Sequence, residues 1–227
     1  MIIFASDNHY GVHPGRCAFE EIKGTLSDVI FAEDDWSIFK RFDLAKDCDL
    51  LILNMIASTC GNPLPDEDAC LAVKRYCETG KNLLLLHGSS AAFWHCPWFR
   101  ENSGLRWVRP GDPDEIPPSV HPVEPYTVKI AKTRHPLCKK LVEMDFTEAD
   151  EIYSSMEQTQ PLWILMQTTI SSGTHPMLTE SVNQWGGKVI NFMPGHNPAV
   201  TRNPDYIKNL KTLIAYLKPT TKLFKGE

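Results

Sequence analysis

The sequence predicts an α/β fold in which a mostly parallel, doubly wound sheet carries helices on both faces. Short apolar segments such as Ile2–Ala5 and Leu83–Leu86 alternate with segments whose apolar residues have helical spacing. Apolar segments without alternation indicate strands buried on both faces, which is typical of parallel sheets. The chain has 227 residues, of which 42% are hydrophobic. We therefore expect one large α/β domain over residues 1–227.

The expected elements of the first half follow one another as strand, helix and strand. The expected strands are Ile2–Ala5, Val29–Ala32, Asp49–Asn54 and Asn82–Leu86. A first helix is expected within Pro14–Leu26, where apolar residues recur at helical spacing. A second is expected over Asp66–Thr79, because its acidic first turn suits the positive end of the helix dipole and Gly80 can end it.

The second half opens with a proline-rich stretch, Arg106–Pro125. Proline excludes a regular helix or a central strand there, and we expect a long surface excursion that forms one wall of a pocket. The expected strands beyond it are Tyr126–Ala131, Leu162–Gln167 and Lys188–Met193. The last expected helix, Asp205–Leu217, has its apolar residues on one face.

Charge and hydropathy exclude several classes of partner. The formal net charge of −5 and the pI near 5.9 leave no basic surface for nucleic acid. No apolar run approaches the roughly 20 residues that span a bilayer, so no membrane partner is expected. The first residues lack the pattern of a signal peptide, and the seven cysteines are an odd number. We therefore expect a reducing, cytoplasmic location without a disulfide framework, with Cys70 and Cys77 as buried small apolar residues.

Polar residues stand at the end of each expected strand, where a doubly wound sheet binds its ligands. They are Asp7, Asn8 and His9 after the first strand, Asn54 at the third, His87, Gly88, Ser89 and Ser90 after the fourth, and His196 after Lys188–Met193. A single histidine after a strand is most often a loop residue bonded to the backbone. Three at matching positions favour a shared site for acid or base chemistry. We expect Asn54 and Ser89 to line it.

A metal ion is one alternative at this predicted site. Histidines together with a carboxylate form a plausible ligand set for zinc or manganese. The sequence therefore leaves the cofactor unknown, with a divalent metal as one alternative.

The pair His87-Gly88 is the sharpest local signal. A strand that turns abruptly through a glycine resembles a nucleophile elbow, whose tip residue projects into the active site. The nearest cysteine, Cys96, is too far along the chain to occupy that tip. Gly-x-Ser-x-Gly is also absent, which argues against a serine hydrolase despite Ser89 and Ser90.

Other candidates each have a structural alternative. Asp150-Glu151 offers carboxylates, although a solvated acidic turn would have the same sequence. His135 precedes a proline and is compatible with a simple turn. Trp94 belongs to an aromatic group that either packs a helix face or forms a stacking wall for a sugar ring. His95 and His121 lie in loops without partners that the sequence identifies.

Taken in order, these segments resemble the ThuA (trehalose-utilisation) family. The likeness rests on the expected strand followed by His87-Gly88, His135-Pro136-Leu137, Asp150-Glu151-Ile152-Tyr153, Trp185-Gly186-Gly187-Lys188-Val189 and Pro194-Gly195-His196, together with Trp94 and Trp98. The resemblance implies a flavodoxin-like, class I glutamine amidotransferase-like fold and a link to trehalose or related carbohydrate metabolism. It also implies His87, Glu151 and His196 as the recurring polar positions, with His135 and Tyr153 in support. The segment from Asp7 to Tyr10 matches the family's first loop only loosely.

Two functions from different classes stay open. The first is an enzyme that catalyses hydrolysis, isomerisation or elimination of a small sugar or oxidised sugar. It would have no glutaminase activity, because the elbow cysteine is missing. Its catalytic residues would be His87, Glu151 and His196, and its substrate-binding residues His9, Asn54, Ser89, Trp94, His135 and Tyr153. The second is a binding or scaffold protein that retains the amidotransferase-like shell. A homodimer is expected only from the frequency of two-fold oligomers.

Overall fold

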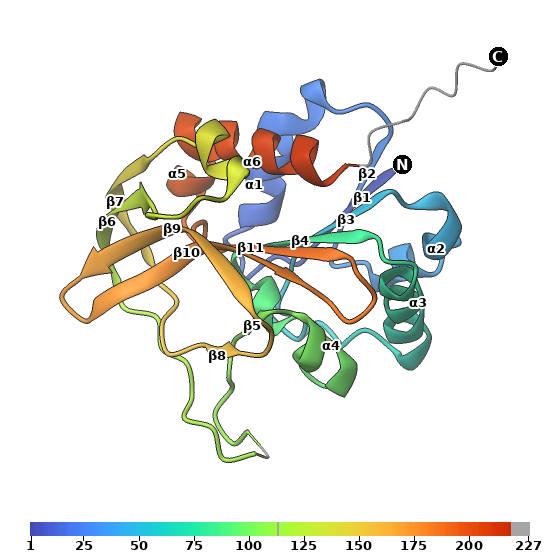
Figure 1. The fold of residues 1–227 in the computed structure, drawn as a ribbon. Helices are drawn as coiled ribbons and strands as arrows, with labels where there is room; N and C mark the ends of the chain where they lie inside the picture. The colour runs from blue at the N-terminus through green and yellow to red at the C-terminus, as the bar shows by residue number, and fades with distance from the viewer. Residues whose placement is uncertain (113, 219–227) are drawn as a thin grey trace.

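The computed structural model describes residues 1–112 and 114–218. Within them, one sheet of nine strands has the order β2-β1-β3-β4-β11-β10-β9-β6-β7 (Figure 1). Its strands are β1 (Ile2–Ser6), β2 (Val29–Glu33), β3 (Leu50–Asn54), β4 (Asn82–Leu86), β6 (Val123–Ile130), β7 (Met144–Glu151), β9 (Leu162–Ile170), β10 (Gly173–Val182) and β11 (Lys188–Phe192). A short second sheet pairs β5 (Leu105–Arg106) with β8 (Glu157–Gln158).

The half of the sheet from β2 to β11 is parallel and confirms the expected doubly wound fold. The chain passes from β1 to β2 on one side and then to β3 and β4 on the other, which is the flavodoxin-like order. The strands end in register: Ser6 is paired with Asn54, and Leu86 with Phe192. The loops that follow β1, β3, β4 and β11 therefore leave the sheet at one common edge.

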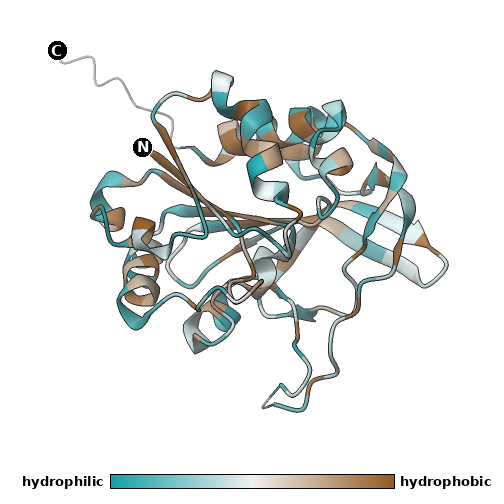
Figure 2. Cartoon of the chain, turned by 180° about the vertical axis from the view of Figure 1, so that it is seen from behind, coloured by the Kyte–Doolittle hydropathy of each residue, from teal (hydrophilic) through white to brown (hydrophobic). Residues whose placement is uncertain are grey.

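Helices cover both faces of this parallel half (Figure 1). Neighbouring residues of β1 face opposite sides. Phe4 belongs to the hydrophobic cluster that includes Ala18 of helix α1 (Pro14–Ile22), whereas Ile3 belongs to the one that includes Val73 of helix α3 (Glu67–Glu78). Both faces of the strand are thus apolar, which explains the continuous apolar runs. Figure 2 shows the parallel strands in hydrophobic brown and the helices with mixed faces.

The helical segments match the expected positions in outline. They are α1 (Pro14–Ile22), η1 (Lys23–Thr25), η2 (Trp36–Phe39), α2 (Leu44–Asp47), α3 (Glu67–Glu78), η3 (His87–Ala91), α4 (Pro97–Asn102), η4 (Pro136–Lys140), α5 (Pro198–Thr201) and α6 (Pro204–Leu217). The expected helix Pro14–Leu26 is shorter than predicted, because it tightens into the 3-10 turn η1 after Ile22. Within the described residues, no helix is long and apolar enough to cross a membrane.

The half of the sheet from β10 to β7 is antiparallel and was not predicted in this form. The expected strand Leu162–Gln167 is the first part of β9, which turns back into β10 as a hairpin. The segment before Glu151 is the strand β7, so its interpretation as a solvated acidic turn is wrong. The pairing of β7 with β6, which no local pattern reveals, decides its structure.

The proline-rich stretch ends earlier than predicted. β6 begins at Val123, inside the expected excursion, and includes Pro125. The ladder between β6 and β7 shifts register between Glu124 and Tyr126, so the proline lies at an irregularity where its missing N–H is tolerated. Residues 107–112 and 114–122 belong to the long connection that was expected.

Burial on both faces predicts a large stability difference between two leucines. Leu84 in β4 is fully buried, whereas Leu71 on α3 is 41% exposed. We expect Leu84→Ala to lower the free energy of unfolding by about 2–5 kcal/mol, since it leaves a cavity in the core. Leu71→Ala is the control and should cost less than about 1 kcal/mol. Urea denaturation followed by circular dichroism measures both, and equal effects would contradict the layered core.

Candidate functional site

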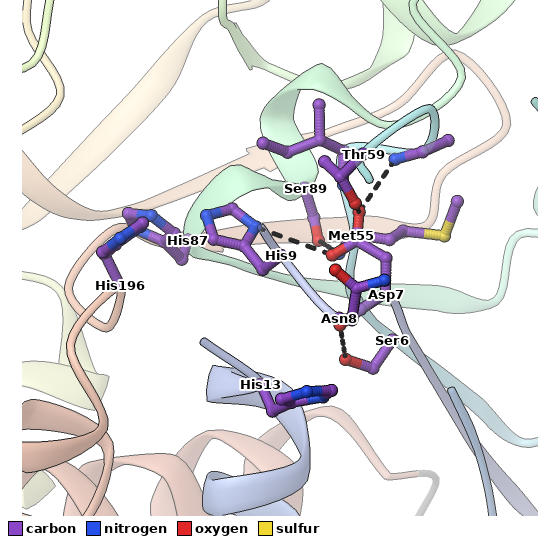
Figure 3. A network of polar contacts seen from close by, with 12 residues as sticks. Ser6, Asp7, Asn8, His9, His13, Met55, Thr59, His87, Ser89 and His196 are labelled. Carbon is purple, nitrogen blue, oxygen red and sulfur yellow. Dashed lines mark hydrogen bonds and ion pairs between the residues drawn. The ribbon is translucent and has the colours of Figure 1, made fainter. Parts of the chain in front are cut away.

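Three histidines meet at the common edge of the parallel strands. His9 follows β1, His87 follows β4 and His196 follows β11. The ring centroids of His9 and His87 are 5.0 Å apart, those of His9 and His196 are 5.0 Å apart, and those of His87 and His196 are 5.5 Å apart. Figure 3 shows the three imidazoles gathered together, with Asp7 beside His9. The structure thus brings the predicted histidines together.

A carboxylate from the antiparallel half completes the cluster. Glu151, the last residue of β7, places Oε2 3.4 Å from Nε2 of His87 and 3.5 Å from Nδ1 of His196. One ligand atom from each of His9, His87, Glu151 and His196 lies within 4.8 Å of every other. We call these four residues the histidine–glutamate centre.

The turn after β4 has the strained geometry of an elbow. His87 adopts a left-handed backbone conformation with φ of 44°, which is uncommon for a residue other than glycine. A Cβ at Gly88 would approach Cγ1 of Ile56 to 2.7 Å and Cε1 of His9 to 2.9 Å. Glycine is therefore required beside His87, because the imidazole of His9 packs directly against this backbone.

Neighbouring groups fix which nitrogens face the centre. Nδ1 of His87 lies 2.9 Å from the carbonyl oxygen of Met193, and it must carry hydrogen because a carbonyl only accepts. Nε2 of His87 therefore points to Glu151 and to the hydroxyl of Tyr153, 3.2 Å away. Nδ1 of His9 faces Oδ1 of the buried Asp7 at 3.6 Å. Orienting contacts of this kind are typical behind metal-binding or catalytic imidazoles.

Asp150, next to the centre, holds the loop that carries His196. Its buried carboxylate accepts hydrogen bonds from the backbone N–H of Gly195 at 2.9 Å and of Asn197 at 2.6 Å. The hydroxyl of Tyr126 donates a third, at 3.1 Å. Adjacent residues of β7 thus have different tasks: Asp150 fixes the loop after β11, and Glu151 belongs to the centre.

Burial and charge perturb the pKa values in the centre in opposite directions. Burial alone would lower the pKa of His87, but its contact with Glu151 and the charge of Asp150 outweigh it and raise that pKa. Burial would raise the pKa of Glu151, yet the bond and charge of His87 lower it to about 2. Burial lowers the pKa of His9 and of His196. At neutral pH Glu151 is therefore ionised and His9 and His196 are neutral, while the contact with Glu151 favours the protonated form of His87.

An open cavity of about 350 Å³ borders the centre. His9 and Glu151 form part of its wall, whereas His87 is fully buried behind them. His121 also reaches Glu151, with 3.3 Å between Nδ1 and Oε1. The other lining residues are Tyr10, Ile56, Ala91, Trp107, Arg109, Pro110 and Tyr153.

Several predicted site residues lie outside this cavity. Asn54 and Ser89 are buried beneath it, and the hydroxyl oxygen of Ser89 accepts a hydrogen bond from the backbone N–H of Met55 at 2.8 Å. Trp94 stacks on the guanidinium of Arg109 at 4.5 Å and borders a neighbouring cavity of about 410 Å³. His135 lies elsewhere, 3.6 Å from the buried carboxylate of Glu180, so it does not join the histidine–glutamate centre.

Residues of the proline-rich stretch form much of the wall, as expected for that stretch, although they were not named individually as site residues. Trp107 packs on Tyr153 with 4.5 Å between ring centroids and on His121 with 5.6 Å. Arg109 lines both the 350 Å³ cavity and the neighbouring one. The prolines signalled the excursion, but only the folded chain shows which of its side chains face the site.

The strand order and the strained elbow after β4 define a class I glutamine amidotransferase-like α/β protein. The structure of PurLQS from Thermotoga maritima is similar, with a TM-score of 0.54 and 12% identity over 95% of this chain and 99% of that one. In class I glutamine amidotransferases the elbow carries a cysteine, and here it carries His87.

The sequence model of the family ThuA, trehalose utilisation, matches residues 2–217, and the chain belongs to this family. A ThuA-like protein from Parabacteroides merdae is 18% identical with a TM-score of 0.65, covering 91% of this chain and 82% of that one. A ThuA-like protein from Bacteroides uniformis is 15% identical with a TM-score of 0.68, covering 95% and 89%. A search of the curated proteins found no significant match.

The contacts of Asp150 predict that it stabilises the fold and positions His196. We expect Asp150→Asn to lower the free energy of unfolding by about 1.5–3 kcal/mol, because the amide cannot accept all three hydrogen bonds in this geometry. Asp145→Asn, at an exposed position of the same strand, is the matched control and should have little effect. Equal stability of the two variants in urea would refute this role.

Proposed function

We propose that this ThuA-family protein is a metal-dependent enzyme that acts on a small sugar-derived substrate in the 350 Å³ cavity. The observation that carries the proposal is the histidine–glutamate centre, whose four ligand atoms lie within 4.8 Å of one another beside that cavity. The family description, trehalose utilisation, supports a sugar as the substrate class.

The donor set supports a divalent metal ion of the zinc type. Zinc binds imidazole nitrogen at about 2.0–2.1 Å and carboxylate oxygen at about 2.0–2.2 Å, so the donors of a tetrahedral site lie roughly 3.3–3.5 Å apart. The contacts of Glu151 with His87 and His196, at 3.4 and 3.5 Å, have this spacing. Small side-chain movements would bring His9 into the same sphere.

The surroundings of the imidazoles suit ligand chemistry. Metal ions bind neutral imidazole and ionised carboxylate, and the lowered pKa values of His9, His196 and Glu151 favour these forms. The pKa of His87 is raised, so this imidazole would release its proton when a metal ion binds. The carbonyl of Met193 and the carboxylate of Asp7 orient two of the rings from behind.

The cavity wall suits a sugar. Tyr10, Trp107 and Tyr153 offer aromatic faces and hydroxyl groups, and sugar rings bind against such faces while polar side chains bond their hydroxyls. Arg109 and His121 supply further polar groups on the cavity wall. These are residues of the proline-rich connection, so this segment of the chain would set the substrate preference.

The proposed chemistry is proton transfer at a polarised sugar. A bound divalent ion supplies a Lewis acid for a carbonyl or hydroxyl oxygen of the substrate. The side chain of His121 is 49% exposed and lies 3.3 Å from Glu151. It is therefore placed to donate a proton to the substrate, or to accept one from it, at that oxygen or at the carbon that carries it. Hydrolysis, isomerisation and elimination all require this step.

The alternative, a scaffold that kept the amidotransferase-like shell, draws its support from the missing elbow cysteine. A scaffold does not require oppositely perturbed titratable groups in one place, whereas an active site commonly contains them. The raised pKa of His87 beside the lowered pKa of Glu151 therefore favours the enzyme.

Metal binding tests the centre directly. We expect the purified chain to bind one divalent ion per chain at this centre, and His87→Ala and His196→Ala to weaken binding at least tenfold, since each removes a ligand (an estimate of about 1.4 kcal/mol or more). His175→Ala, on the β9–β10 hairpin, is the matched histidine control and should bind as wild type does. Elemental analysis and zinc titration measure this. Unchanged affinity in both ligand variants would refute the metal centre.

Sugar binding tests the cavity. A disaccharide or keto-sugar at a hundred times its dissociation constant should stabilise the chain by about 2.7 kcal/mol in a thermal-shift screen that includes trehalose. Trp107→Ala should weaken that sugar roughly two- to tenfold, since it removes an aromatic face. Trp163→Ala, 53% exposed on β9, is the control. If no sugar raises the melting temperature, the substrate class proposed here is wrong and the scaffold alternative gains.

A further inference from the structure

A second cluster of ligand-type side chains lies apart from the histidine–glutamate centre. It consists of Cys70 on α3 and of His95 and Cys96 just before α4, and we call it the thiol cluster. One ligand atom from each lies within 4.8 Å of the other two. Sγ of Cys70 is 3.2 Å from Nε2 of His95. The two cysteines are buried, with 6% and 8% exposure.

A tight turn brings the two loop residues back to the helix. Phe93 adopts a left-handed conformation with φ of 50°, and the N–H of Cys96 donates to its carbonyl oxygen at 2.7 Å. The ring of Phe93 is fully buried and packs against Phe39 and Phe99, with centroids 5.7 and 5.6 Å away. The turn is thus anchored in the core, which holds His95 and Cys96 against α3.

The predicted interpretation of Cys70 as a small apolar residue is incomplete. Cys77 lies seven residues further on in α3, among apolar residues of the hydrophobic core. It has no polar side-chain partner among the described residues. Cys70 instead contacts an imidazole and a second thiol. Nδ1 of His95 is buried and has no hydrogen-bond partner in the described part of the chain, so the polar contact of this ring is the one that Nε2 makes with Cys70.

The donor types select a soft cation. Two thiolates and one imidazole are ligands for zinc and copper(I), whereas carboxylate and carbonyl oxygens suit magnesium and calcium. Zinc–sulfur bonds are about 2.3 Å, so two thiolates of one tetrahedral site lie roughly 3.8 Å apart. The spacing of the thiol cluster needs only small movements to meet this value.

The cluster is also accessible. All three residues line a cavity of about 390 Å³, together with Glu67, Lys74 and Trp98 among others. His95 borders the 410 Å³ cavity as well. A cation bound by three protein ligands would therefore have its fourth position open to a water molecule or another small ligand.

We propose that Cys70, His95 and Cys96 form a second metal site, which binds zinc through two thiolates and one imidazole. The site shares no residue with the histidine–glutamate centre, and it does not depend on the proposed enzymatic function. Bound zinc ties the loop of residues 93–96 to α3. That loop includes Trp94, which stacks on Arg109, a residue of the substrate cavity wall.

Cobalt(II) is the probe that separates the two sites, because thiolate-to-cobalt charge transfer absorbs in the near ultraviolet and imidazole and carboxylate ligands do not produce this band. The full chain, reduced and freed of metal, is titrated with cobalt(II). We expect the band in the wild type and in His87→Ala, which keeps the thiol cluster. The double variant Cys70→Ser/Cys96→Ser should lose it, and the control Cys77→Ser should keep it.

A band that is absent in the wild type, or that persists in the double variant, overturns the proposal. His95→Ala is a second variant on a partly exposed side chain, which guards against failure of the double variant to fold. It should weaken zinc binding by about tenfold or more in competition with a chelator while leaving the circular dichroism spectrum unchanged. Unchanged zinc affinity in His95→Ala also overturns the proposal. Loss of metal binding in His87→Ala alone concerns only the histidine–glutamate centre.

Discussion

The candidate site depends on one constraint, the common edge at which the parallel strands end. β4 and β11 are neighbours in register, and β1 is separated from β4 only by β3. The loops that follow these strands are therefore close in space although they are far apart in the chain. Histidines in those loops meet as a consequence of backbone pairing, before any side-chain interaction is considered.

The antiparallel half of the sheet supplies two further carboxylates to the site. β7 ends beside the histidines, so Glu151 joins them while Asp150 binds the backbone of the loop that carries His196. Buried carboxylates are costly unless they are paired or hydrogen-bonded. Here Glu151 pairs with the histidines and Asp150 accepts backbone hydrogen bonds, and both contacts hold β7 against the loop after β11. Fold stability and site geometry therefore depend on the same contacts.

The two ligand clusters differ in chemistry and in surroundings. The histidine–glutamate centre has nitrogen and oxygen donors at the edge of the sheet, beside a cavity with aromatic walls. The thiol cluster has two sulfur donors and one imidazole, and it lies between α3 and the loop that precedes α4. Trp94 and Arg109 connect them, because the tryptophan belongs to the loop next to the thiols and the arginine to the cavity wall. The two proposed sites are therefore linked by one stacked pair.

The sequence by itself determined the parallel half of the fold and three of the four residues of the histidine–glutamate centre by position, because apolar strands and the polar residues after them are local patterns. His9, His87 and His196 were recognisable in this way, and Glu151 through its family resemblance. Only the tertiary structure decided the antiparallel strands, the place of His135 away from the site and the approach of His121 to Glu151. These depend on pairings between distant segments, and such pairings leave no period or motif in a single sequence.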